Sequence, residues 1–527
     1  MKRNMRIQIL LFALMAMVQG AWAQSPEPSE ELTKLSQFLE STTYSFYYPS
    51  VNAKGEPVVL SAALIAWTPT DRQETDCIES IHLYSHATIC ADKECPSADS
   101  GTQEMTVMKT LPKREYKDAM KPTDVANYVG RCIIIAPDYE GYGVSKDDQH
   151  PYLAQRLTAR QVLDAYNYGV QLYSKQAEET SVDNPLLPIT DDWRTFTLGY
   201  SQGGAVSLAV QRLIEEEELS DQMHYYGSIV GDGSYDLIET LHYYFFDDGD
   251  SYGKQTVHRK GICTYPMVLP LILKGMCDTN PEVAQYSIGD FLSQQLIDTG
   301  IIDWIESKQY STADIASMWA QQLQTGVDVP GRQYTPEQMA EMFFIADNGN
   351  LYGHLEKMLT PETFAYLNDP DKTAQVPAVA TNAQEAIHRA LADNTVANGW
   401  EPQHRIQFYH SRGDMIVPYG NYLSFYAAHP SGEEGLYQVN DTFADSDHFS
   451  AAIQFFLRLS MTSSFAGHFN WICDGVSPSG IENVGATSEI HPRHDGIWYS
   501  LDGSPLSGKP TRRGIYLYNN QKVVIDQ

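Results

Sequence analysis

The sequence is poor in basic residues. Lysine and arginine together number 36, against 67 aspartate and glutamate residues, and the formal net charge is −31. A surface this acidic repels nucleic acids and anionic membranes, so we expect neither as a partner. The charge balance carries no information about catalysis, which has to be sought in motifs.

Long apolar runs are missing beyond the N-terminus. Residues 7–18 form a mostly apolar run after the basic residues Lys2 and Arg3, and Ala21-Trp22-Ala23 follows it. The run is too short for a comfortable membrane span, and its flanks are typical of a secretory signal peptide, which we predict at residues 1–23. We therefore expect an exported protein, secreted or periplasmic or held at the cell surface, with no stable membrane insertion.

Cysteine is scarce and lacks metal-binding spacing. The seven cysteines form no CxxC and no Cys/His pattern, so we predict no metal site. Disulfides are permitted in an exported protein, and Cys90 with Cys95 or Cys263 with Cys277 are plausible local pairs. Seven is an odd number, however, and pairing cannot be deduced from spacing alone. Cys132, in an apolar run, is our candidate for a free thiol.

Strand and helix patterns alternate over residues 24–235. A short amphipathic helix is expected within residues 24–40. The unbroken apolar run at residues 132–136 is typical of a parallel strand buried on both faces, and an amphipathic helix pattern follows at residues 159–175. This alternation predicts an α/β fold with a doubly wound, mostly parallel sheet.

The pattern changes after residue 235. Residues 236–400 combine helical patterns and loops without a clear strand, over a stretch too long for a loop. Strand patterns then return at residues 405–410. We therefore predict a large, mostly helical cap or lid at 236–400, inserted into a sheet domain that resumes at 401–465. A linker at 466–490 and a small β tail at 491–527 complete the predicted organisation.

The stretch that suggests chemistry is Gly199-Tyr200-Ser201-Gln202-Gly203. A β-like run ends in this Gly-x-Ser-x-Gly motif, and small and apolar residues continue at helical spacing, so the sequence predicts strand, sharp turn and helix. The glycines let strand and helix approach closely while Ser201 sits in a strained turn with its hydroxyl exposed. Alone the motif is weak evidence, because glycine and serine are common.

A serine nucleophile needs a base and an acid that orients the base. In such a sheet these residues follow the serine in the order acid, histidine, each after a later strand. Asp414 follows a strand and a glycine, and His448 stands after one more strand and just before a helix. We therefore predict a catalytic triad of Ser201, Asp414 and His448. Three other carboxylates compete for the role of the acid: Asp441, Asp445 and Asp447.

The oxyanion hole requires two backbone N–H groups near Ser201. The Gln202 N–H, at the start of the helix, is the first candidate, and the helix N-terminus itself favours negative charge. The second donor is expected in the loop that follows Tyr84, from Ala87 or Thr88.

Together these motifs resemble the α/β-hydrolase superfamily. The likeness is carried by the Ser201 motif, by Pro137-Asp138-Tyr139-Glu140-Gly141-Tyr142-Gly143, by His150-Pro151-Tyr152, and by the surroundings of Asp414 and His448. It is strongest to the secreted lipase and esterase branch with a large helical lid, which often has His-Gly-Thr where this chain has His86-Ala87-Thr88. The last thirty residues resemble C-terminal tails of secreted Gram-negative proteins, some of which are sorting signals.

The motifs and the resemblance predict a secreted serine hydrolase that cleaves carboxylic esters through an acyl-enzyme, without a cofactor. Its partner would be a small-molecule ester or a lipid. A peptidase of the same fold is one alternative, although no group that would hold a peptide terminus can be identified in the cap. A non-catalytic binding protein is another, and the complete triad argues against it. The acyl chain length and the oligomeric state have no sequence signal.

Overall fold

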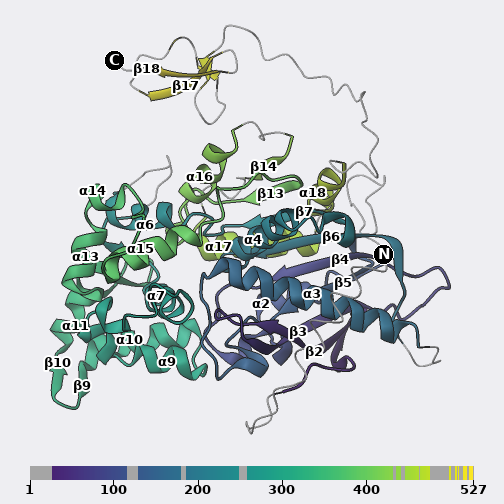
Figure 1. Ribbon diagram of the computed structural model, residues 1–527, viewed down its shortest axis with the longest axis horizontal. Helices are drawn as coiled ribbons and strands as arrows, with labels where there is room; N and C mark the ends of the chain where they lie inside the picture. The colour runs from purple at the N-terminus through teal and green to yellow at the C-terminus, as the bar shows by residue number, and fades with distance from the viewer. Residues whose placement is uncertain are drawn as a thin grey trace. The chain divides into compact units, whose positions relative to one another are not determined.

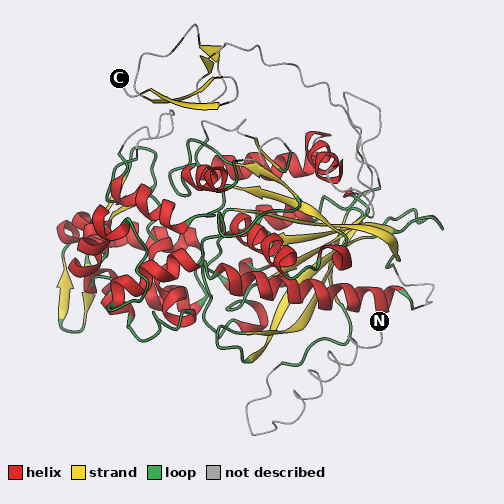
Figure 2. Ribbon diagram, turned by 45° about the horizontal axis from the view of Figure 1, so that its top comes forward, coloured by secondary structure: helices red, strands yellow, loops and turns green. Residues whose placement is uncertain are grey.

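The computed structural model describes residues 26–114, 129–179, 185–248, 258–430, 435–440, 446–461 and 463–474, together with short strands nearer the C-terminus. The chain divides into two units, residues 1–476 and 477–527. The predicted signal peptide at 1–23 lies outside the described residues. Figures 1 and 2 show the first unit as a twisted sheet with helices against it and a group of helices beside it.

The first unit is built on a nine-stranded sheet in the order β1-β2-β3-β5-β4-β6-β7-β13-β14. Strands β1, β2 and β3 run antiparallel to their neighbours, and β5, β4, β6, β7, β13 and β14 pair in parallel. The strands are β1 Thr33–Phe38, β2 Ser41–Val51, β3 Pro57–Trp67, β4 Ile78–Ser85, β5 Cys132–Pro137, β6 Ile189–Tyr200, β7 Tyr225–Gly231, β13 Arg405–Tyr409 and β14 Tyr437–Asn440.

Helices cover both faces of this sheet. Alternate residues of β5 show why: Ile133 and Ile135 pack on one side, while Cys132 and Ile134 pack on the other, so the strand is apolar throughout. One face lies under α3 Gln155–Ala177, α4 Gln202–Glu216 and α16 Gly420–Ala428, and the other under α2 Gln103–Met108, α17 His448–Met461 and α18 Ser463–Asp474.

The segment at 236–400 is mostly helical and has a core of its own, in which Trp319 and Phe343 are fully buried. Its helices are α6 Leu237–Phe246, α7 Val268–Thr279, α8 Gln294–Asp298, α9 Ile301–Ser307, α10 Thr312–Thr325, α11 Pro336–Met342, α12 Leu355–Met358, α13 Pro361–Leu367, α14 Pro370–Thr373 and α15 Ala383–Asp393. The segment also contains short strands that the sequence did not predict: β8 Ile262–Cys263, β9 Val327–Val329, β10 Arg332–Tyr334, β11 Phe343–Ile345 and β12 Leu351–His354. Strands of two to four residues are too short to produce a visible alternation.

Three further expectations differ from the structure. The helix expected within residues 24–40 is wrong, because β1 occupies Thr33–Phe38 and hydrogen-bonds to β2. The predicted linker at 466–490 begins too early, since its first residues belong to α18, where Phe469 and Ile472 are buried. All seven cysteines are free thiols, so neither of the suggested local pairs forms a disulfide.

The second unit contains the strands β15 Trp498–Tyr499, β16 Pro505–Leu506, β17 Gly514–Tyr518 and β18 Gln521–Ile525. They form a four-stranded antiparallel sheet in the order β16-β15-β17-β18, within the range predicted as a β tail. No helix in the described part of the chain is both long enough and apolar enough to span a bilayer.

Candidate active site

Ser201 lies in a strained turn between β6 and α4. Its backbone angles are φ 57° and ψ −124°, a conformation that a residue with a Cβ rarely adopts. A Cβ on Gly199 would collide with the main chain of Gly203, and a Cβ on Gly203 would collide with the carbonyl oxygen of Ser85. The two glycines of the motif are therefore required by the close approach of α4 to β6 and β4.

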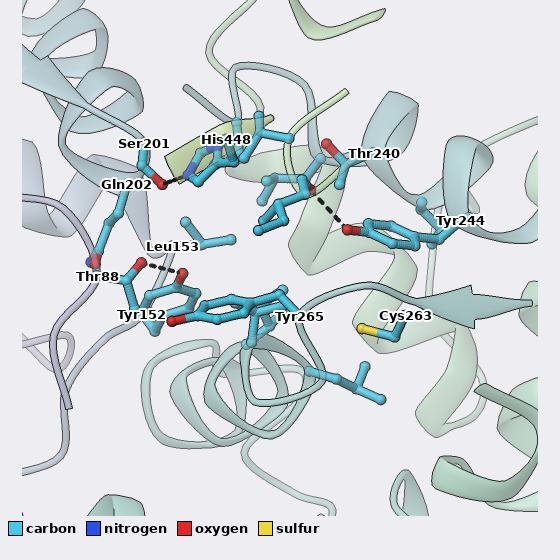
Figure 3. A pocket seen from close by; sticks show the side chains of 18 of the residues that line it. Thr88, Tyr152, Leu153, Ser201, Gln202, Thr240, Tyr244, Cys263, Tyr265 and His448 are labelled. Carbon is cyan, nitrogen blue, oxygen red and sulfur yellow. Dashed lines mark hydrogen bonds between the residues drawn. The ribbon is translucent and has the colours of Figure 1, made fainter. Parts of the chain in front are cut away.

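Ser201, His448 and Asp414 form a continuous hydrogen-bond chain. The Nε2 of His448 lies 2.9 Å from Ser201 Oγ, and its Nδ1 lies 2.5 Å from Asp414 Oδ2. Asp414 follows β13, and its other oxygen accepts hydrogen bonds from the backbone N–H groups of Ile416 at 2.8 Å and Val417 at 2.9 Å. The structure thus brings together three side chains that come from three separate parts of the sheet domain. Figure 3 shows the contact between Ser201 and His448.

Of the competing acids, Asp447 caps a helix instead of contacting the imidazole of His448. Its carboxylate accepts hydrogen bonds from the backbone N–H and the hydroxyl of Ser450, so Asp447 caps the start of α17. Asp441 and Asp445 lie outside the described residues. Within the part of the chain that the structure describes, Asp414 is the carboxylate hydrogen-bonded to His448.

The electrostatics of the site favour a basic imidazole. Burial alone would lower the pKa of His448, but the charge and the hydrogen bond of Asp414, together with smaller contributions from other nearby acids, outweigh burial, and the pKa is raised above its ordinary value. Since Asp414 is a hydrogen-bond acceptor, the proton of neutral His448 sits on Nδ1. The lone pair of Nε2 then faces the Ser201 hydroxyl, as a general base requires.

The two candidate regions of the oxyanion hole differ in the hydrogen bonding of their backbone N–H groups. Gln202 is in the first turn of α4, where backbone N–H groups have no partner within the helix. The N–H of Ala87, in contrast, donates to the carboxylate of Glu104 at 3.1 Å. Sequence reasoning missed Glu104, which also accepts a hydrogen bond from the hydroxyl of Tyr84 and whose pKa is raised by burial.

Thr88 contributes its side chain to the same region. Its hydroxyl lies 2.7 Å from that of Tyr152, and both residues line the cavity next to Ser201 (Figure 3). The His150-Pro151-Tyr152 stretch therefore reaches the site through Tyr152. A chemical role for Ala87 or Thr88 stays a prediction, and the Ala87 N–H would first have to exchange its bond to Glu104 for one to the oxyanion.

The side chain of Gln202 is held by a second buried histidine. His150 Nδ1 donates to the carbonyl oxygen of Glu140 at 2.9 Å, so its Nε2 accepts a hydrogen bond from the Gln202 amide at 3.0 Å. Burial lowers the pKa of His150 to about 3, which keeps the ring neutral and the arrangement fixed. His150 and Glu140 thereby fix the residue that follows the nucleophile.

An elongated apolar cavity of about 250 Å³ opens from Ser201 into the helical segment (Figure 3). The helical segment contributes Leu367, Ile387 and Leu391, from α13 and α15, to its lining. A second cavity, of about 330 Å³, borders His448 and Phe449 from another side and is lined in part by polar residues: Thr264, Asn348, Asn350, Tyr352 and Asp447. His448 is thus a wall shared by an apolar and a more polar cavity.

One group of side chains in the described part of the chain has the composition of a metal site. Single ligand atoms of Asp232, His410 and Asp414 lie within 4.8 Å of one another, and all three residues are buried. Protein hydrogen bonds engage these groups, however: Asp232 accepts from the Ser411 N–H at 2.7 Å, and His410 Nε2 donates to the Val417 carbonyl at 3.0 Å. Hydrogen bonding accounts for the cluster without an ion.

The comparisons with known proteins concern the fold. No protein-family profile matches the sequence, and no curated protein is similar enough to be matched. A candidate hydrolase from Legionella pneumophila has a solved structure that superposes with a TM-score of 0.56 at 14% identity, covering 83% of this chain and 91% of that one. The rice cell wall degrading esterase LipA from Xanthomonas oryzae superposes with a TM-score of 0.56 at 17% identity, covering 82% and 96%. With its mostly parallel sheet, flanking helices and Ser201 turn, this chain has the α/β-hydrolase fold.

Proposed function

We propose that the protein is an exported serine hydrolase that cleaves carboxylic esters. The observation that carries the proposal is the chain of hydrogen bonds from Asp414 through His448 to Ser201, with contacts of 2.5 and 2.9 Å. LipA, which has the same fold, is described as an esterase, and this supports the assignment. Export rests on the signal-peptide pattern at residues 1–23.

In the proposed reaction, Ser201 Oγ attacks the ester carbonyl while His448 Nε2 takes its proton. The negative charge that develops on the carbonyl oxygen is stabilised by the Gln202 N–H and the N-terminal end of α4. His448 then gives the proton to the leaving alcohol, and an acyl group remains on Ser201. Water, activated by His448 in the same way, releases the acid and restores the serine.

The cavities indicate how an ester would lie. The apolar cavity, whose lining includes both Ser201 and Leu391, suits an aliphatic acyl group, because burying each methylene there is worth about 0.8 kcal/mol. The alcohol must stay within reach of His448 Nε2 to receive its proton, and the second, more polar cavity borders that residue. We therefore propose an ester with an apolar acyl part and a more polar alcohol.

The proposal is tested with p-nitrophenyl esters of increasing acyl length, set beside aminoacyl naphthylamides that report peptidase activity. Ester turnover is expected, together with covalent labelling of Ser201 by a fluorophosphonate probe. Ser201→Ala should lower kcat by at least about 10³-fold and abolish labelling. Ser317→Ala is the matched control, because Ser317 is exposed on α10. Activity that survives in Ser201→Ala, or labelling of another residue, would contradict the proposal.

A further inference from the structure

A second buried carboxyl group lies behind the Ser201–His448–Asp414 chain. Asp232 directly follows β7, and its side chain is 1% exposed. One of its oxygens lies within 4.8 Å of an oxygen of Asp414. Two carboxylates this close in a buried site repel strongly, and one of them is expected to hold a proton.

The surroundings of Asp414 favour the ionised form. Three N–H groups point at its carboxylate, those of Ile416 and Val417 at Oδ1 and that of His448 Nδ1 at Oδ2. N–H donors stabilise a carboxylate, and a proton on either oxygen would compete with them. The proton of the pair therefore belongs on Asp232.

The contacts of Tyr200 locate this proton independently. The Tyr200 hydroxyl oxygen lies 2.5 Å from Asp232 Oδ2 and also 2.7 Å from the backbone carbonyl oxygen of His448. A hydroxyl has one proton, and a carbonyl oxygen can only accept. The hydroxyl can donate to either acceptor. With its single proton directed at the His448 carbonyl, the short contact with Asp232 is made by a proton on Asp232.

The neighbouring groups agree with a neutral Asp232. Its Oδ1 accepts from the Ser411 N–H at 2.7 Å and lies 3.7 Å from His410 Nε2. The proton on that Nε2 is donated to the Val417 carbonyl, and His410 Nδ1 is buried without a partner in the described structure. A second N–H, on Nδ1, would have no acceptor among the described residues, so the geometry offers no partner for a charged ring. Burial raises the pKa of Asp232 in the same sense.

We propose that Asp232 is a neutral positioning residue of this site: it donates its proton to Tyr200, and Tyr200 donates to the backbone carbonyl of His448. This link fixes the first residue of α17, and with it the direction in which the imidazole faces Ser201. Because Asp232 carries no charge, Asp414 is the anion that sets the basicity of His448. Only the kinetic consequences of this inference rest on the proposed hydrolase function.

Asp232→Asn distinguishes a neutral Asp232 from an ionised one. An asparagine amide can donate to Tyr200 and accept from the Ser411 N–H, as a protonated aspartate does. Asp232→Leu should lower kcat at least about tenfold with little change in KM, because the imidazole loses its fixed direction. Asp232→Asn should keep most of the wild-type kcat, because its amide maintains both hydrogen bonds. The acid limb of the pH profile of Asp232→Asn should coincide with that of the wild type. An ionised Asp232 would instead give a shift to lower pH of about 1–2 units, the effect of one unit charge at about 6 Å in a dielectric of 20.

Infrared difference spectroscopy tests the same point without activity. At pH 8 the wild type should show the C=O stretching band of a protonated carboxylic acid that is lost in Asp232→Asn and kept in Asp192→Asn, a control on the exposed part of β6. The absence of such a band would overturn the inference even if Ser201→Ala abolishes ester turnover. If Ser201→Ala stays active but the band is present, the hydrolase proposal fails and the assignment of the proton stands.

Tyr200→Phe provides a second, independent variant. It removes the link while leaving Asp232 in place, so the loss in kcat should match that of Asp232→Leu. The double variant should lose no more than either single one, because both break the same connection. Additive losses would show that the two residues act separately, and would overturn the relay.

Discussion

Replacing Asp414 by asparagine should be more damaging than removing its side chain altogether. In Asp414→Asn, the two backbone N–H groups of Ile416 and Val417 still need an acceptor, and they select the amide oxygen. The amide nitrogen is then left facing His448 Nδ1, where Asp414 Oδ2 now lies at 2.5 Å. Because that nitrogen can only donate, it forces Nδ1 to accept and moves the imidazole proton to Nε2.

An Nε2 that carries the proton cannot accept one from Ser201. The expected loss in kcat is about 10⁴-fold, equivalent to about 5 kcal/mol of transition-state stabilisation, as for the analogous change in serine proteases. Asp414→Ala has no amide and lets the imidazole adopt either tautomer. It should therefore retain about tenfold more activity than Asp414→Asn, although it too loses the charge that stabilises the imidazolium.

The assay is kcat/KM for a short-chain p-nitrophenyl ester across the pH range, with circular dichroism to verify that each variant is folded. Asp447→Asn is the matched comparison, because it removes the charge of a competing acid that lines the second cavity, while asparagine still caps α17. It should stay within about threefold of the wild type. If Asp414→Asn kept more than a tenth of the activity, or Asp447→Asn lost as much as Asp414→Asn, the assignment of the acid would be wrong.

Three other predictions concern the same site. Turnover requires neutral His448, whose pKa is raised because Asp414 and other nearby acids together outweigh burial. We therefore expect kcat/KM to fall on the acid side with a midpoint above about 6.5, and a midpoint below about 6 would contradict this. Gly203→Ala should destabilise the fold by about 1–3 kcal/mol in thermal unfolding and inactivate it, since the added Cβ meets the main chain of β4, whereas Gly101→Ala, with nothing within 4 Å of a Cβ, should change neither. Leu391→Phe should fill part of the apolar cavity and lower kcat/KM for long-chain esters while sparing butyrate; an equal loss on both would show that long acyl chains do not extend to Leu391.

The parts of the molecule that could be predicted from the sequence have short-range signals. The turn at Ser201 is such a case, because its strand, its glycines and its helix are adjacent in the chain and each leaves its own pattern. The apolar run at 132–136 likewise predicts a strand buried on both faces, and β5 is one. The helical segment at 236–400 is outlined by its lack of strand alternation. Its strands are too short for a visible alternation: β9 with β10 and β11 with β12 form small hairpins, and β8 pairs with β12 from a distant part of the segment.

The residues that were missed depend on which strands become neighbours. Glu104 lies on the short helix α2, and only the folded chain brings it to the Ala87 N–H. A buried acid of this kind has no local motif, and its effect on the oxyanion region could not have been anticipated. Ala87 is predicted as a donor because it follows β4. Its position in the sequence does not reveal that its N–H already donates to the carboxylate of Glu104.

The sequence does contain a signal for Asp232, namely its position at the end of a strand. It directly follows β7 and lies between two glycines, and, like Asp414 in the loop after β13, it stands at the carboxyl end of a strand, where the catalytic residues of such a sheet lie. Its partners are 32 residues away at Tyr200 and 179 residues away at Ser411, so its role depends on β6, β7 and β13 lying side by side. Once that strand order is known, two acids at neighbouring strand ends must divide one proton between them. The number of N–H donors around each acid decides which of the two keeps its charge, and Asp414 has more of them.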